Sequence, residues 1–188
     1  MVDGVFVHER GLCESETVGR GTRVWAFAHV MPGALIGNDC NIGDHAFIES
    51  GAVLGDRVTV KNAVLVWDKV SIGNDVFLGP NMIFTNDMNP RVKFKKDASG
   101  FLPTVVEDGV SIGANATIVC GTRLGHDCFI GAGAVVVTDV PAHALMVGNP
   151  ARQVGWVCEC GKKLSPALAC DCGRRYKLSS THLVETRH

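Results

Sequence analysis

The chain has 188 residues and a formal net charge of −1 at pH 7. This length suits one packed domain with a small appendage, and the near-neutral charge gives no bulk attraction to nucleic acid. No apolar run is long enough to span a bilayer, and the N-terminus lacks the basic start and apolar stretch of a signal peptide. We therefore predict a soluble, cytoplasmic protein that binds neither nucleic acid nor membrane.

Large apolar residues occupy every sixth position in the first part of the chain. The series breaks after Phe84 and resumes with a shifted phase from Val106 to Val136. The residue four positions after most anchors is small or β-branched, as at Ala28 and Val64. Residues at even spacing point the same way from a strand, so each hexad supplies one large and one small inward side chain. The anchors are Phe6, Leu12, Val18, Val24, Val30, Ile36, Ile42, Ile48, Leu54, Val60, Val66, Ile72, Leu78 and Phe84, then Val106, Ile112, Ile118, Leu124, Ile130 and Val136.

This period predicts short strands separated by corners. An amphipathic α-helix places apolar residues at spacings of three and four, which the series does not show. Glycine follows many anchors, as in Ile36-Gly37 and Ile112-Gly113, where we expect corners with unusual dihedrals. Three strands and three corners close a coil of 18 residues that stacks on its neighbours. The sequence therefore predicts an all-β fold, a parallel β-helix of six to seven coils, with no α-helix between residues 18 and 84.

The hexads, together with the stretches 112–116, 130–134 and 147–152, resemble the left-handed β-helix acyltransferases. The resemblance covers about residues 5 to 155 and implies a left-handed coil, a homotrimer, and acetyl-CoA in a groove between neighbouring subunits. The stretches 24–30, 79–87 and 89–91 are similar to a narrower group that N-acetylates 3-amino sugars carried on UDP or dTDP. The UDP-2-acetamido-3-amino-2,3-dideoxyglucuronate N-acetyltransferases look closest, which implies a role in surface polysaccharide or O-antigen synthesis. A dTDP-3-amino-deoxyhexose is the alternative substrate.

Aromatic residues lie early in the chain, where the nucleotide would bind. Trp25, Phe27 and His29 alternate with inward residues, so we expect them on one strand, pointing outward. Outward aromatic side chains need a partner, and either a pyrimidine or the trimer interface would supply it. Lys61 and Asn62 are expected one coil below Gly79 and Pro80, within reach of phosphate or sugar; an ordinary solvated corner is the other interpretation.

An inserted loop is predicted at about residues 85–105, because the anchors Phe84 and Val106 are 22 residues apart. A long loop in a regular solenoid is usually functional, although a solvated basic excursion is the alternative. Arg91 could pair with the carboxylate of a uronic acid, and Asn89 stands where many related enzymes carry a catalytic histidine. Asn86 is expected to accept a hydrogen bond from the substrate amine and orient it for direct attack on the thioester.

The last coils carry the expected cofactor site. Ala114 and Ala132 are 18 residues apart, so they should occupy the same corner of adjacent coils and let pantetheine approach the backbone. The resemblance assigns Val137, Thr138 and Arg152 to the closing of the acetyl-CoA site, where Arg152 could pair with a phosphate. Tight corners also require small residues, so the Gly-Ala steps alone do not identify the cofactor. His126, followed by Asp127, is a competing general base, but we expect it beside the cofactor tail and away from the loop.

Four cysteines follow the repeat, so the chain divides into a β-helix at residues 1–155 and a tail at 156–188. Two clusters, each followed by glycine, suit a structural zinc site in a ribbon-like hairpin, although zinc knuckles more often have two intervening residues. A hairpin with free thiols is the alternative. The four cysteines are Cys158, Cys160, Cys170 and Cys172.

Two other functions are compatible with this fold. A zinc-dependent carbonic anhydrase needs three convergent histidines, two of them close together on one coil, and the sequence shows no such pair. A silent scaffold is the other alternative, because a solenoid can serve as a spacer. The cofactor-type ending at residues 147–152 argues for the acetyltransferase.

Overall fold

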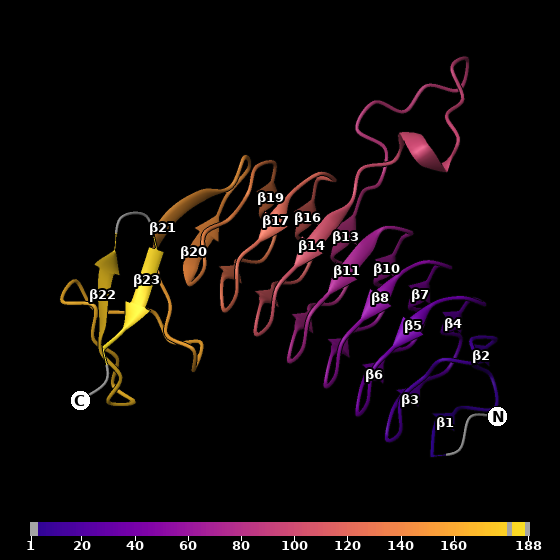
Figure 1. The fold of residues 1–188 in the computed structure, drawn as a ribbon, viewed down its shortest axis with the longest axis horizontal. Helices are drawn as coiled ribbons and strands as arrows, with labels where there is room; N and C mark the ends of the chain where they lie inside the picture. The colour runs from indigo at the N-terminus through magenta and orange to yellow at the C-terminus, as the bar shows by residue number, and fades with distance from the viewer. Residues whose placement is uncertain (1–3, 180–181, 187–188) are drawn as a thin grey trace.

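A computed structural model describes residues 4–179 and 182–186 of the chain. It is a rod of stacked coils with three parallel sheets along its length, and the inserted loop projects from one side (Figure 1). Within the described residues the only helical segment is the 3₁₀ turn η1 (Ala98–Gly100), and none is long and apolar enough to cross a bilayer. The predicted all-β solenoid without a helix in residues 18–84 is confirmed, and the left-handed sense stays a prediction from the resemblance.

We name the sheets A, B and C. Sheet A comprises β1 (Phe6–Val7), β3 (Arg23–Val24), β6 (Asn41–Ile42), β9 (Thr59–Val60), β12 (Phe77–Leu78), β15 (Ser111–Ile112), β18 (Phe129–Ile130), β20 (Ala144–Val147) and the antiparallel β21 (Arg152–Trp156). Sheet B comprises β2 (Leu12–Cys13), β4 (His29–Val30), β7 (Phe47–Ile48), β10 (Leu65–Val66), β13 (Ile83–Phe84), β16 (Thr117–Ile118) and β19 (Val135–Val136). Sheet C comprises β5 (Leu35–Ile36), β8 (Val53–Leu54), β11 (Val70–Ile72), β14 (Thr104–Val106) and β17 (Arg123–Leu124). A separate hairpin joins β22 (Tyr176–Ser179) to β23 (His182–Glu185).

The coil forms about eight turns, more than the six to seven that the hexad count predicts. Sheet A shows the reason, because it holds parallel strands from β1 to β20, including an irregular coil at each end. At the start, Phe6 pairs with Arg23 and Val7 with Val24, so the register is one residue short of the regular period. The expected inward anchors Phe6 and Leu12 are consequently wrong: they are 47% and 50% exposed.

The interior of the rod is filled by the two predicted residue columns. From Val24 onward the large anchors are buried, and Phe84 is the largest side chain that is fully enclosed. The small column behaves in the same way, with Ala28 and Ala46 1% exposed. Burying one of the large anchors contributes about 1.5–3 kcal/mol, so the stacked anchors are the main source of stability.

Glycines that follow the anchors serve a different purpose from the one expected. Gly37 and Gly113 are not in the left-handed region; instead, a Cβ on Gly113 would lie 2.5 Å from the backbone nitrogen of Ala132 in the next coil. The left-handed residue comes two positions later, as at Asp39 (φ 55°) and Asn115 (φ 56°). The glycine is therefore required by the close approach of neighbouring coils rather than by its own dihedrals.

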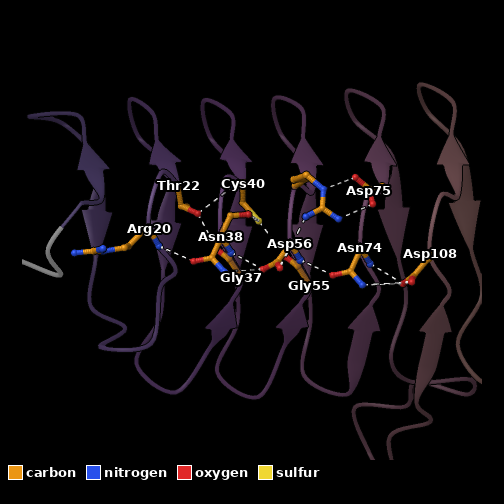
Figure 2. A network of polar contacts seen from close by, with 11 residues as sticks. Arg20, Thr22, Gly37, Asn38, Cys40, Gly55, Asp56, Asn74, Asp75 and Asp108 are labelled. Atoms are coloured by element: carbon orange, nitrogen blue, oxygen red, sulfur yellow. Dashed lines mark hydrogen bonds and ion pairs between the residues drawn. The ribbon is translucent and has the colours of Figure 1, made fainter.

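Polar side chains connect the coils along the corner between sheets C and A, which we call the CA edge (Figure 2). The backbone N–H of Asn38 donates to Asp56 Oδ1 (2.7 Å). In the same way the backbone N–H of Asp56 donates to Asn74 Oδ1 (2.9 Å), and that of Asn74 donates to Asp108 Oδ1 (2.7 Å). Each of these coils thus supplies one side-chain acceptor for a corner amide of the preceding coil that the parallel ladder does not reach. This explains why Asn and Asp recur one position after the corner glycine.

Candidate functional site

Small residues line one edge of the last coils, at the corner between sheets A and B, which we call the AB edge. The amide of Gly133 donates to the carbonyl of Ala114 (2.8 Å), so Ala114 and Ala132 occupy equivalent places in adjacent coils, as predicted. The amide of Gly131 donates to Met146 O, which puts Gly148 at the same place one coil further on. Ala132 is exposed, and a Cβ on Gly133 would have no atom within 4 Å. The backbone of this edge is therefore open to a ligand.

The AB edge continues toward the N-terminus through Asn62, Lys61 and Trp25. The amide of Lys61 donates to Leu78 O (3.0 Å) and that of Asn81 to Asn62 O (3.1 Å), so Lys61 and Asn62 lie one coil below Gly79 and Pro80. Three of the predicted nucleotide residues, Trp25, Lys61 and Asn62, thus share one edge with the predicted pantetheine residues.

The expected single strand for Trp25, Phe27 and His29 is wrong. Trp25 and Phe27 lie in the corner between β3 and β4, because Phe27 adopts a left-handed conformation with φ 58°. Trp25 donates its indole N–H to Asn41 (2.8 Å), and Phe27 is 52% exposed and stacks on His45 with the ring centroids 4.9 Å apart. His29 lies on sheet B, where Nε2 is 2.7 Å from Glu14 Oε2.

The inserted loop leaves the rod at the corner between sheets B and C, which we call the BC edge. Its two ends are fixed: Trp67 donates its indole N–H to Phe84 O (2.8 Å), and the Leu102 amide donates to Asn86 O (3.0 Å). Asn86 is half-buried, and its side-chain amide makes no hydrogen bond within the described residues. The loop therefore presents a positioned amide that is available to a substrate.

Further along the loop, the Asp87 carboxylate forms an ion pair with Lys96 and accepts a hydrogen bond from the backbone N–H of Asn89 (2.9 Å). The hydrogen bond from Lys96 lowers the pKa of the Asp87 carboxyl, which makes it a weaker base than an unpaired carboxylate. Asn89 and Arg91 are exposed. A cavity of about 410 Å³ lies among the loop residues Asp87, Pro90, Arg91, Val92, Phe94, Lys95, Lys96 and Phe101.

The five predicted cofactor residues divide between two edges. The amide of Val119 donates to Val136 O, so Val137 and Thr138 follow at the BC edge and not beside Ala132. Both are exposed. Arg152 lies near the AB edge, because it pairs with Val147, which is 2.9 Å from a Cβ built on Gly131. One chain therefore brings Ala114, Ala132 and Arg152 together and leaves Val137 and Thr138 apart.

His126 lies on the CA edge, the edge that carries neither the loop nor the small residues. It lies away from the loop, as expected, and within one chain it lies on a different edge from Ala132, although the two share a coil. Its Nδ1 is 3.0 Å from Asp127 Oδ2, and its ring centroid is 5.0 Å from that of His143. The hexad period does not predict this histidine pair, because the last coil is two residues short: Ile130 pairs with Met146, 16 positions on.

The group formed by His126, Asp127 and His143 keeps its ligand atoms within 4.8 Å of one another. His143 is 6% exposed, and burial lowers the pKa of its imidazole. Its Nδ1 has no hydrogen-bond partner among the described residues. The third member of the group is a carboxylate, so it does not supply the three imidazoles that the carbonic anhydrase alternative requires.

Comparison with known proteins shows the family to which this chain belongs. The model of the bacterial transferase hexapeptide family (six repeats) matches residues 17–50 and 103–138. The chain is 48% identical over 175 residues to the dTDP-3-amino-3,6-dideoxy-alpha-D-galactopyranose 3-N-acetyltransferase of Aneurinibacillus thermoaerophilus, covering 92% of this chain and 90% of that relative. The chain belongs to the hexapeptide-repeat acetyltransferase family. The relatives that it matches are N-acetyltransferases, so the scaffold alternative is not supported.

Two solved structures share the fold of this acetyltransferase. The acetyltransferase domain of PglB from Neisseria gonorrhoeae FA1090 has a TM-score of 0.55 at 22% identity, covering 80% of this chain and 57% of that one. A mutant form of AntD, an N-acyltransferase from Bacillus cereus solved with dTDP and coenzyme A, has a TM-score of 0.50 at 15% identity and 83% coverage of both chains.

Proposed function

We propose that this acetyltransferase moves the acetyl group of acetyl-CoA to the 3-amino group of a dTDP-linked 3-amino-3,6-dideoxyhexose, in the cytoplasm, to supply surface polysaccharide synthesis. The observation that carries the proposal is the 48% identity to the Aneurinibacillus enzyme over 92% of this chain. The aligned region extends well beyond the hexads, so the likeness is not a property of the repeat alone. The predicted UDP-linked uronic acid is the second candidate, because Arg91 is exposed beside the loop cavity and could pair with a carboxylate.

The AB edge is suited to the pantetheine and nucleotide of acetyl-CoA. Ala114, Ala132 and Gly148 leave the corner backbone accessible over successive coils, and Arg152 beside them can form an ion pair with a phosphate. The edge runs toward Lys61 and Asn62, which would meet the diphosphate or the sugar of the second substrate. Acetyl-CoA supplies an activated thioester, and the protein has to hold the amine in line with its carbonyl carbon.

The reaction needs no general base from the loop. The amine nitrogen forms the new C–N bond, the C–S bond to coenzyme A breaks, and the amine proton goes to water or to the departing thiolate. A sugar amine with a pKa near 8 costs only about 1.4 kcal/mol to present neutral at pH 7, whereas a lysine-like amine costs roughly 4.6 kcal/mol. Asn86 then contributes by accepting a hydrogen bond from the amine, which orients its lone pair.

Two halves of the site lie on different edges of one chain, and a trimer would join them. Outward residues of sheet B form an apolar stripe that includes Leu12, Phe47, Leu65 and Ile83, of which Leu12 and Ile83 are 50% and 47% exposed. A threefold axis facing this sheet would bring the AB edge of one subunit against the BC edge of the next. Val137, Thr138 and the Asn86 loop would then complete the neighbour's groove.

A substrate panel tests the proposal. Purified protein is assayed for coenzyme A release with acetyl-CoA and matched dTDP- and UDP-linked sugars, each with and without a 3-amino group. We expect release only with 3-amino sugars and a higher kcat/KM for the dTDP-linked 6-deoxyhexose. Preference for the UDP-linked uronic acid, lost in Arg91→Ala, would establish the second candidate, and equal release without any amino sugar would contradict both.

A further inference from the structure

Beyond the acetyltransferase site, the tail carries four cysteine thiols that converge at one point. The sulfurs of Cys158, Cys160, Cys170 and Cys172 all lie within 4.8 Å of one another. Cys158 Sγ is 3.5 Å from Cys172 Sγ, and Cys160 Sγ is 3.5 Å from Cys170 Sγ. A tetrahedral zinc with bonds of about 2.3 Å to sulfur separates its ligands by about 3.8 Å. The thiols are therefore already at nearly the spacing of such a site.

Two equivalent turns hold the thiols in place. In the first turn the Cys158 amide donates to Lys162 O (2.9 Å) and the Gly161 amide to Cys158 O (2.8 Å). In the second, the amides of Cys170 and Gly173 donate to Arg174 O (2.9 Å) and Cys170 O (3.0 Å) in the same pattern. Gly161 and Gly173 have φ of 83° and 95°, which lets each turn close tightly. The chain thus repeats one cysteine-presenting turn after 12 residues.

The core that surrounds these turns is too small to order the tail alone. Among the tail residues that the structure describes, its buried members are Cys158, Leu164, Cys170, Tyr176 and Leu183. A chain shorter than roughly 40 residues usually needs a metal, a disulfide or a partner to fold, and the tail is shorter than that. The cysteines are free thiols, so a disulfide does not supply that stability.

We propose that the tail binds one Zn²⁺ through the Sγ atoms of Cys158, Cys160, Cys170 and Cys172, as a structural site. Four thiolates and Zn²⁺ leave a net charge of −2. Arg174 places a positive charge beside one ligand, with Nη1 3.7 Å from Cys172 Sγ. Arg174 also pairs with Glu159 and Glu185, and Lys162 pairs with Asp171. A closed set of four protein ligands leaves no position for a substrate, so the metal has no catalytic part.

The zinc-bound tail would close the end of the β-helix. Tyr176 lies between the two units: its hydroxyl is 3.1 Å from Cys158 Sγ, and its ring centroid is 5.4 Å from that of His143 in the last coil. Trp156 packs against both cores. The final coil of a solenoid exposes its interior unless a cap covers it, and the metal holds that cap in place.

Metal analysis of the intact protein tests the site. We expect about one zinc per chain by mass spectrometry of the eluted metal, and cobalt-loaded protein should show the thiolate charge-transfer and tetrahedral ligand-field bands. Cys160→Ser and Cys172→Ser each remove one ligand with little effect on packing, because both side chains are exposed. Cys13→Ser is the matched control, since Cys13 lies in the first coils.

After dialysis against EDTA, the two tail variants should retain at least tenfold less zinc than the control. Removing a group that only hydrogen-bonds to a metal ligand already lowers the metal affinity roughly 10-fold to 100-fold, and these variants remove a ligand itself. Limited proteolysis should then cut the tail and leave the β-helix intact. Equal zinc in Cys160→Ser and Cys13→Ser, iron in place of zinc, or metal-free protein with a protease-resistant tail would each overturn the proposal. None of these outcomes depends on the substrate of the acetyltransferase.

Discussion

Replacing Asn86 or His126 separates two mechanisms for amine activation. If the protein mainly positions an amine that is already partly neutral, Asn86→Ala should slow the reaction and His126→Ala should leave it nearly unchanged. The structure places Asn86 at the start of the loop on the BC edge and His126 on the CA edge. The imidazole of His126 therefore cannot reach and deprotonate an amine that is bound at the loop of its own chain.

The expected loss follows from what the substitution removes. The Asn86 backbone carbonyl keeps its hydrogen bond from the Leu102 amide, and Phe84 O keeps that from Trp67, so the loop start stays in place. Only the side-chain amide is lost. A hydrogen bond to a charged or reacting group contributes about 1.5–3 kcal/mol, which corresponds to a loss on the order of 10²-fold at the upper end.

Steady-state kinetics with the preferred sugar measures both variants over a range of pH. The native profile of kcat/KM should rise with one apparent pKa that belongs to the substrate amine, and neither variant should move it. Removing a true general base costs roughly 10²-fold to 10⁴-fold. A His126→Ala enzyme slowed by 10³-fold or more, with Asn86→Ala nearly normal, would refute the positioning mechanism.

Three further outcomes are expected. Ala132→Trp should abolish coenzyme A binding in calorimetry without changing the far-UV spectrum, because Ala132 is exposed on the open AB edge; unchanged affinity would mean that the groove lies elsewhere. Ile83→Glu should convert the proposed trimer to inactive monomers in light scattering, whereas Val53→Glu, at an apolar position 37% exposed on sheet C, should leave the assembly unchanged. Burial lowers the pKa of His143, so the unfolded chain binds more protons and stability should fall as the pH drops below about 6.5. In His143→Gln this part of the pH dependence should disappear, and an unchanged thermal-unfolding profile would contradict the burial argument.

The hexad series determines the interior of the rod because large and small inward residues must alternate in every strand. It could not reveal where the period slips. Phe6 and Leu12 fail as anchors because the first coil is one residue short, and His126 meets His143 because the last coil is two residues short. Such slips leave the apolar pattern almost intact while they move every outward residue relative to its neighbour.

Residue type also predicted the corners less well than the strands. Phe27 and Ala63 adopt left-handed dihedrals with φ of 58° although neither is glycine, because the corner position decides the conformation and the stacked coils stabilise it. The glycines instead mark where backbones approach most closely. That distinction depends on contacts between coils, which a single hexad does not contain.

The division of the predicted cofactor residues is the strongest argument for assembly. Ala114 and Val137 are 23 positions apart, which is five more than one regular coil, so no refolding of a single rod can put them on one edge. The same holds for Lys61 on the AB edge and Asn86 on the BC edge. If both sets act on one pair of substrates, the edges must come from different subunits that meet across sheet B. We therefore expect activity to be lost on dilution to monomers while the fold stays unchanged.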